Sequence, residues 1–372
     1  DTMSSNQFRI AVFAGDGIGL EITEPCVMLV ERALAKVGGV SASPVRLAAG
    51  AGAYRATGEA LPAASLAEAR KADAILLAAM GDPATRYPDG TEIMPQVDLR
   101  MELGLYAGVR PVRSIPGVGG PLADPRASAL DFVLIRESTE GLFAHFRDGV
   151  VEPDDSAAHD RLTITRAGTE RVSEFAFRLA AQRKAAGFPG LVTCVDKANA
   201  FKSYAFFRKV FDERAAYHPS IRKGYAYVDA FALDMVRRPW DFDVVVTENI
   251  FGDILSDLGA GLIGGLGFAP SADIGDAHAV FQPCHGTAPD IAGKGIANPT
   301  AMILSGAMML EWLGDTHGSP EATAAGALLR HAVDHAFAGG ELTPYDRGGR
   351  SDTAAIVKAI AAALDQPVPE VV

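Results

Sequence analysis

The sequence has little of what marks secreted or membrane-spanning proteins. Its three cysteines, Cys26, Cys194 and Cys284, lie far apart and form no CxxC pair, which argues against a disulfide framework and a structural zinc site. No window reaches the ~18 uncharged apolar residues of a membrane span, and the N-terminal residues lack the basic and apolar regions of a secretion signal. We therefore expect a cytoplasmic protein whose thiols pack in the core.

Positive charge is also scarce. Against 46 aspartates and glutamates stand 34 lysines and arginines, so the net charge is −12. Such an acidic chain lacks the basic footprint of nucleic-acid binding, and we expect neither a nucleic acid nor a membrane as partner. At roughly 150 residues per domain, 372 residues with 48% hydrophobic content predict two domains with well-filled cores.

Short apolar runs alternate with helical patterns along the chain. Strands that are apolar throughout are buried on both faces, so this alternation predicts an α/β protein with a largely parallel sheet. The polar segment 147–162 predicts a loop or an excursion that a partner subunit could cover. The expected strands cover residues 8–14, 72–79, 131–137, 191–196 and 243–248, and the first helix is expected over residues 20–37.

Three glycines, Gly15, Gly17 and Gly19, lie between the first expected strand and helix. They are similar to a dinucleotide-binding fingerprint, but the third glycine of that motif would fall at Leu20. The stretch 38–50 also has no acidic residue to hold a ribose. The pattern therefore favours a tight turn over a conventional Rossmann site.

Arg100, Arg110 and Arg136 are candidates for carboxylate binding, because a guanidinium grips a carboxylate with two parallel hydrogen bonds. A solvated surface position is the alternative, and we prefer it for Arg100 taken alone. Arg136 differs because it ends an apolar strand, where α/β proteins present ligand-binding groups.

Asp253 and Asp257 are four residues apart on an expected helix and share one of its faces. An exposed acidic face remains an alternative, since such a pair costs only about 0.2–0.5 kcal/mol there. The neighbours Ile254, Leu255 and Leu258 indicate a largely buried helix instead, in which two carboxylates need a cation. Oxygen ligands favour magnesium or manganese over zinc.

Lys197 follows an expected strand, Asp229 lies in YAYVDAFALD, and His285 lies in the small-residue loop 281–300. Each taken alone is more often structural or solvated. A lysine near other cations would have its pKa lowered and could accept a proton. Loops rich in small residues let backbone approach a ligand, which favours nucleotide contact for 281–300.

Together the motifs resemble the β-decarboxylating dehydrogenases, the family of 3-isopropylmalate, isocitrate, homoisocitrate and tartrate dehydrogenases, over nearly the whole chain. The resemblance implies a non-Rossmann α/β fold with a cleft between two domains, residues 1–105 plus 264–372 and residues 106–263. It also implies a homodimer with shared active sites, joined partly through an arm at about 147–162. The motifs are AGDGIG, LRxxLxLYAxxRPVR, IRESTEGLF, DKAN, YVDAFALD, NIFGDILSDL and HGTAPDIAGKGIANPTAMILS.

The resemblance also implies roles for individual residues. Arg100, Arg110, Arg136 and Gln96 would bind the hydroxy-dicarboxylate or tricarboxylate substrate. Asp229, Asp253 and Asp257 would hold Mg or Mn, and Lys197 and Asp229 would be catalytic in the neighbouring subunit's site. NAD rather than NADP is expected, because Asp290 and Ile291 stand where NADP-using relatives tend to have Lys-Tyr. The implied NAD contacts are Asn199, His285, Gly286, Thr287, Ala288, Asp290, Ile291 and Asn298.

The chain departs from the family at the position of the tyrosine that protonates the enolate, where it has Phe143. Water could replace it, or His145 if the segment is extended, because the side chains of Phe143 and His145 would then share a face. The positions around the carbon 3 substituent, Gln96, Val97 and Ala200, match neither isopropylmalate nor isocitrate enzymes. We expect 3-isopropylmalate as substrate; the alternatives are isocitrate, homoisocitrate, D-malate or tartrate, or a non-catalytic regulatory subunit.

Overall fold

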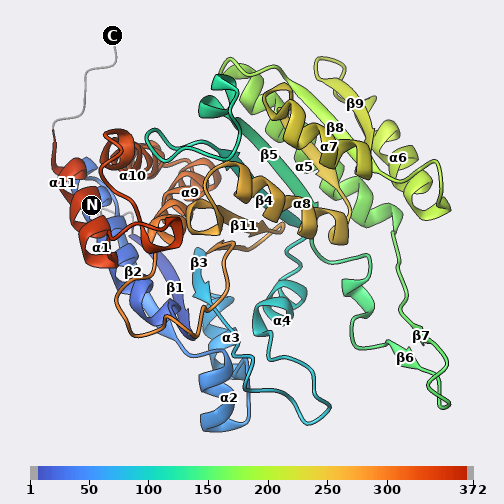
Figure 1. The fold of residues 1–372 in the computed structure, drawn as a ribbon, viewed down its shortest axis with the longest axis horizontal. Coiled ribbons are helices and arrows are strands. Elements are labelled where there is room, and N and C mark those ends of the chain that lie inside the picture. The colour runs from blue at the N-terminus through green and yellow to red at the C-terminus, as the bar shows by residue number, and fades with distance from the viewer. Residues whose placement is uncertain (1–6, 367–372) are drawn as a thin grey trace, which may run out of the picture.

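The computed structural model describes residues 7–366, which fold around one ten-stranded sheet (Figure 1). Six of its nine neighbouring strand pairs are parallel, which confirms the expectation of a largely parallel sheet. In spatial order the strands are β2 (Ser41–Leu47), β1 (Gln7–Gly15), β3 (Ala74–Ala79), β12 (Ala279–Pro283), β11 (Pro270–Ile274), β4 (Ala107–Arg113), β5 (Asp131–Glu137), β10 (Val244–Thr247), β8 (Leu191–Asp196) and β9 (Arg222–Tyr227).

The sheet consists of two parallel halves joined by an antiparallel centre. Strands β2, β1, β3 and β12 form one half, and β5, β10, β8 and β9 form the other. Between them β11 and β4 pair antiparallel with each other and with their outer neighbours. The sequence patterns did not predict these two central strands, because Arg110 and Asp273 interrupt their apolar runs.

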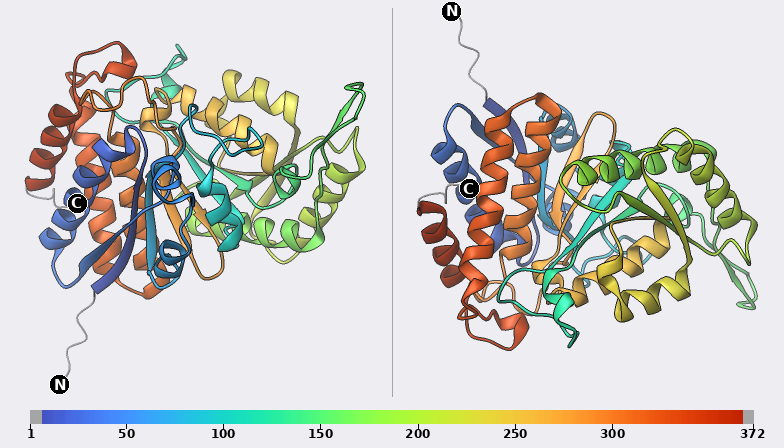
Figure 2. Two further views of the ribbon diagram at one scale, coloured as in Figure 1. Left: turned by 90° about the horizontal axis from the view of Figure 1, so that it is seen from below. Right: turned by 90° about the horizontal axis from the view of Figure 1, so that it is seen from above.

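Helices cover both faces of the sheet. Around the first half α1, α9, α10 and α11 pack against one another, and in the second half α5 and α6 lie on one face and α7 and α8 on the other (Figure 2). The helices are α1 (Gly19–Val37), α2 (Ala51–Thr57), α3 (Ala63–Ala69), α4 (Pro95–Glu102), α5 (Arg166–Ala185), α6 (Lys202–Ala215), α7 (Val228–Arg237), α8 (Asn249–Leu262), α9 (Thr300–His317), α10 (Pro320–Ala338) and α11 (Thr353–Asp365).

Residues 147–162 do leave the body of the protein. They carry a short antiparallel hairpin of β6 (Val150–Val151) and β7 (Ala158–His159), which projects away from the sheet (Figure 1). Val150 and Val151 are both exposed in the single chain. The expected excursion is therefore a hairpin arm rather than an irregular loop.

Helix α8 is less buried than its sequence suggested. Leu255 packs into the core, but Ile254 on the other side is 63% exposed. Leu233 and Val236 of the neighbouring α7 are exposed as well. The expectation of a largely buried α8 is wrong for the single chain, because only one face of this amphipathic helix reaches the sheet and no residue between 7 and 366 covers the other.

Within residues 7–366 we find no helix with both the length and the apolar character that a bilayer crossing requires.

Candidate active site

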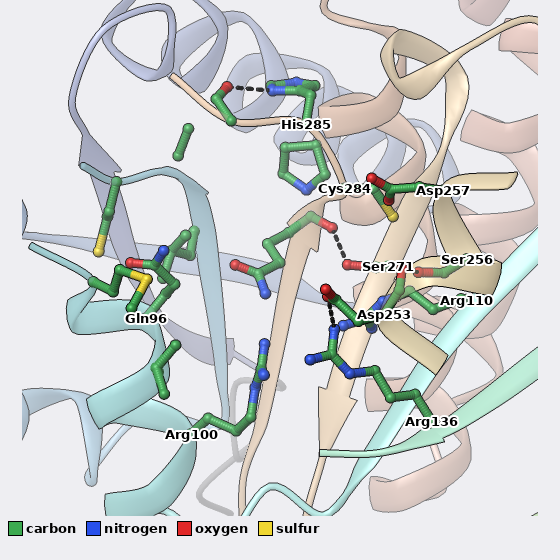
Figure 3. Close-up of a pocket in the computed structure, with 18 of the residues that line it drawn as sticks. Gln96, Arg100, Arg110, Arg136, Asp253, Ser256, Asp257, Ser271, Cys284 and His285 are labelled. Carbon is green, nitrogen blue, oxygen red and sulfur yellow. Dashed lines mark hydrogen bonds and ion pairs between the residues drawn. The ribbon is translucent and has the colours of Figure 1, made fainter. Parts of the chain in front are cut away.

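A cavity of about 330 Å³ lies where the two halves of the sheet meet (Figure 3). Its walls come from the end of β3, from α4, from the central strands and from α8. The cavity brings together most of the residues expected to bind substrate and metal. Those that line it are Gln96, Arg100, Arg110, Arg136, Asp253 and Asp257, and two of the expected cofactor residues, His285 and Gly286, line it as well.

All three arginines are buried. Arg136 stands near the end of β5, as expected, whereas Arg110 lies within β4 and Arg100 in the last turn of α4. The preference for a solvated Arg100 is wrong, because its side chain is buried and its Nη2 reaches Asp273 Oδ2 of the central strand β11 at 3.4 Å.

Arg136 is held by the first turns of α8. Its Nε donates to Asn249 Oδ1 at 2.8 Å, and its Nη1 donates to Asp253 Oδ1 at 2.5 Å. Burial and then the neighbouring charge of Arg100 lower the pKa of Arg136 to about 10. It therefore stays charged at neutral pH, with its guanidinium fixed at the cavity wall.

Asp273 of β11 is the most deeply buried acid at this site and was missed in the sequence. Arg110 Nη2 donates to its Oδ1 at 3.1 Å, and Arg100 Nη2 lies 3.4 Å from its Oδ2. Burial alone would raise the pKa of Asp273, but Arg100, Arg110 and Arg136 hold it down to about 2. The one signal that could have revealed it is that Asp273 is the single charged residue of the segment APSADI.

Asp253 and Asp257 face the same cavity from adjacent turns of α8 (Figure 3). Burial, followed by the charge of Asp253, raises the pKa of Asp257, so a cation would relieve both effects. The oxygen-only donor set suits magnesium or manganese. In a single chain, however, no three histidine, cysteine, aspartate or glutamate side chains of residues 7–366 converge as a metal site.

Lys197 and Asp229 lie together, but they do not line this cavity. Lys197 Nζ is 2.6 Å from Asp229 Oδ1, between the end of β8 and the first turn of α7. The hydrogen bond from Lys197 lowers the pKa of Asp229, whose side chain is 70% exposed. Asn199, two residues beyond Lys197, is exposed too. This group faces outward from the chain that carries it.

A second cavity, of about 490 Å³, adjoins the turn GDGIG. Gly17 has φ +56°, and a Cβ there would lie 2.2 Å from the carbonyl oxygen of Thr287. Ile18 N donates to that same oxygen at 2.9 Å. The tight-turn interpretation is confirmed, and the turn packs against the 285–292 loop. Because Gly286 lines the first cavity and Thr287 the second, this loop joins the two.

The other expected cofactor residues are distributed along the same loop. Asp290 is exposed and Ile291 half-buried, while Ala288 adopts a left-handed φ of +40°. Asn298 is buried: its Oδ1 accepts from Thr300 N at 3.1 Å and its amide faces Asp346 at 3.3 Å. Asn298 is thus bound into the protein at the start of α9 and lines neither cavity.

Phe143 and His145 lie in a single 3₁₀ turn (Phe143–His145), so the assumption of an extended segment is wrong. With about three residues per turn, positions two apart point to different sides. Phe143 lines the cavity, its ring 5.1 Å from the Arg136 guanidinium carbon. The ring nitrogens of His145 face Asp148 at 3.1 Å and Thr163 at 2.9 Å, so His145 is not a candidate proton donor.

Further polar side chains line the cavity that the sequence did not single out. They include Cys284, for which we expected simple core packing and which packs against the core while also facing the cavity. No local pattern marks these residues, since each lies in or beside a short central strand or on the α8 face already described. They are Ser256, Ser271, Gln282 and Cys284.

Comparison with known proteins gives extensive matches. A family model described as isocitrate/isopropylmalate dehydrogenase matches residues 9–360. The 3-isopropylmalate/3-methylmalate dehydrogenase of Methanocaldococcus jannaschii is 39% identical over 354 residues, covering 95% of this chain and 98% of that protein. The 3-isopropylmalate dehydrogenase of Archaeoglobus fulgidus is 39% identical over 360 residues, covering 96% and 99%. Isocitrate dehydrogenase from Methylococcus capsulatus matches with a TM-score of 0.83 at 36% identity, covering 96% of this chain and 100% of that one.

Proposed function

The chain belongs to the isocitrate/isopropylmalate dehydrogenase family, and from this premise we propose that it oxidises and decarboxylates a 3-substituted malate with NAD and a divalent cation. 3-Isopropylmalate is the substrate we favour, since the similar proteins from two archaea carry that name. The observation that carries the proposal is the convergence of three buried arginines and two aspartates on one cavity.

The arginines supply the substrate's carboxylate contacts. Arg136 is oriented by Asn249 and Asp253 and keeps further N–H groups for a ligand. The Nε of Arg100 is buried and has no hydrogen-bond partner among the described residues. A buried, unpaired donor of this kind is costly unless a ligand satisfies it. A dicarboxylate bound here would meet donors already held in place.

Asp253 and Asp257 would hold the divalent cation, together with Asp229 of the partner subunit. When bound, the cation would make the substrate's hydroxyl more acidic and polarise the resulting ketone. The fit rests on the adjacent acids and on the raised pKa of Asp257. The Asp253 carboxylate is already oriented by Arg136, so its position depends on the same residue that binds the substrate.

Sharing of the site between two subunits is part of the proposal. Lys197 and Asp229 form a pair that faces outward, and two aspartates alone leave a cation under-coordinated. The exposed apolar faces of α7 and α8 and the hairpin arm are surfaces that a second copy could cover. In that arrangement the side chain of Lys197, in its neutral amine form, would take the hydroxyl proton in the partner's cavity. The division into domains 1–105 plus 264–372 and 106–263 belongs to the same proposal.

NAD would occupy the second cavity and reach the first along the 285–292 loop. The exposed Asp290 can accept hydrogen bonds from a free ribose diol and would repel a 2′-phosphate. Gly15 and Gly17 of the turn GDGIG line that cavity. Because glycine has no side chain, the cofactor could approach the backbone closely there.

Two experiments test the proposal. The first measures NADH formation with isopropylmalate, isocitrate, homoisocitrate, D-malate and tartrate, each with magnesium and with manganese. If the protein turns over none of these substrates, the proposal is contradicted. Manganese binding measured by calorimetry then distinguishes an inactive regulatory subunit from an enzyme with another substrate.

The second experiment mixes two inactive variants, Lys197→Ala and Asp253→Asn, after unfolding and refolding them together. If sites are shared, half of the dimers are hybrids with one intact site each, so about a quarter of wild-type activity returns. The control refolds each variant alone. If each active site is built within one chain, the mixture stays as inactive as its components.

A further inference from the structure

Asp273 is a fully buried carboxylate directly behind the arginines of the cavity. It is 1% exposed and receives hydrogen bonds from Arg110, at 3.1 Å, and from Gln282 Nε2, at 2.9 Å. Ser138 Oγ lies 3.4 Å from it. A buried charge is retained only where partners compensate it, and here the compensating charges are the same arginines that face the substrate.

Arg110 is largely occupied by the protein itself. Its Nη1 donates to the carbonyl oxygens of Ala272, at 2.9 Å, and Val109, at 3.2 Å, while its Nη2 is bound to Asp273. Arg100 gives one terminal nitrogen to the same carboxylate. Of the three positive charges at the cavity, one is therefore neutralised by Asp273 before any ligand binds.

Asp273 also orients a second group at the cavity wall. Because the amide nitrogen of Gln282 is bound to the carboxylate, its carbonyl oxygen is left as an acceptor. The Oε1 of Gln96, which also lines the cavity, is buried with no partner among the described residues. Amide oxygens accept hydrogen bonds from hydroxyl groups but repel a carboxylate.

We propose that Asp273 is a specificity-determining residue: its charge makes the cavity favour a substrate with two carboxylates and an uncharged group at carbon 3. This inference rests on the proposed function and narrows it. Asp273 contacts no substrate atom; it acts through Arg100, Arg110 and Gln282. A third carboxylate in the cavity would meet the charge of Asp273 without a free arginine to balance it.

The test compares Asp273→Asn with the wild type on two substrates, 3-isopropylmalate and isocitrate, using kcat/KM. We expect the ratio for isocitrate over isopropylmalate to rise roughly tenfold to a hundredfold. A like charge at a separation of about 6–10 Å has an effect of this size at an effective dielectric constant of about 20. The matched control is Asp276→Asn, which makes the same charge change three residues further on at an exposed position beside Tyr106; its ratio should not move.

The outcomes separate this inference from the function on which it rests. Activity on malates with an unchanged ratio in Asp273→Asn overturns the role of Asp273 and leaves the function standing, whereas no activity on any hydroxy acid in the wild type contradicts the function itself. If Asp273→Asn does not fold, calorimetry on the wild type decides, with succinate and tricarballylate as unreactive probes. Tricarballylate should bind no more tightly than succinate, and binding tenfold tighter would overturn the proposal.

Discussion

The substitution Gly252→Ala in α8 should disable the enzyme through a single added methyl group. A Cβ at this position would lie 2.6 Å from both Cβ and Cγ of Arg136 and 3.2 Å from its Cα. Carbon atoms in contact prefer about 3.5–4.0 Å, so the two elements must separate by about 1 Å. Arg136 cannot swing aside without breaking its bonds to Asn249 and Asp253, which belong to the same helix.

The separation should therefore lift α8 from β5 and displace Asp253 and Asp257 with it. A misplacement of about 1 Å costs on the order of a hundredfold in rate, so we expect kcat/KM to fall about a hundredfold, or roughly 2.7 kcal/mol of transition-state stabilisation. Overpacking costs about 1–3 kcal/mol of stability, while alanine in place of glycine in a helix returns up to about 1 kcal/mol. The variant should fold with slightly reduced stability.

The assay is NADH formation, with urea unfolding measured in parallel. Gly339→Ala is the matched control, since it makes the same change at the C-terminal cap of α10, away from α8, where an added Cβ meets only Glu341 Cγ at 4.0 Å. It should raise the unfolding free energy by about 0.5–1 kcal/mol and leave kcat/KM unchanged. A folded Gly252→Ala with wild-type kcat/KM, or a control that loses activity to the same extent, would refute the reasoning.

Three further predictions concern the cation, a buried acid and the cofactor. Removal of divalent cations with a chelator should abolish NADH formation, and added magnesium or manganese should restore it; activity that the chelator does not change contradicts the metal site. Asp257→Asn should weaken manganese binding at least about tenfold in calorimetry. Burial raises the pKa of Glu137 from 4.5 to about 7 against hydrogen bonds from Thr139 and Glu140, so between these pH values the folded chain holds a proton that the unfolded chain has released. The unfolding free energy should therefore fall as pH rises through this window and then level off, and Glu137→Gln should remove that slope in urea titrations at pH 5 and 7.5. Replacing Asp290 and Ile291 by Lys and Tyr should raise kcat/KM with NADP relative to NAD by at least about tenfold; an unchanged ratio would mean that this pair does not face the ribose.

Half of the sheet could be predicted, because five of its ten strands, β1, β3, β5, β8 and β10, are largely apolar runs. Residues 131–137 and 191–196 were expected as strands with the bounds that β5 and β8 have. The central strands β4 and β11 could not be found in this way, because a strand that carries an arginine or an aspartate toward a cavity no longer looks buried. The charged residues that build the site therefore interrupt the apolar pattern by which its strands would be recognised in the sequence.

The sequence by itself determined the α/β class, the shared helical face of Asp253 and Asp257, and the motifs that indicate the family, because these depend on spacing along a few turns or one strand. Only the tertiary structure decided that Arg100 and Arg110 meet on Asp273 and that His145 turns toward Asp148 and away from the cavity. Arg100 and Asp273 are 173 residues apart. Whether such side chains meet depends on the order and register of the strands, and local spacing carries no information about either.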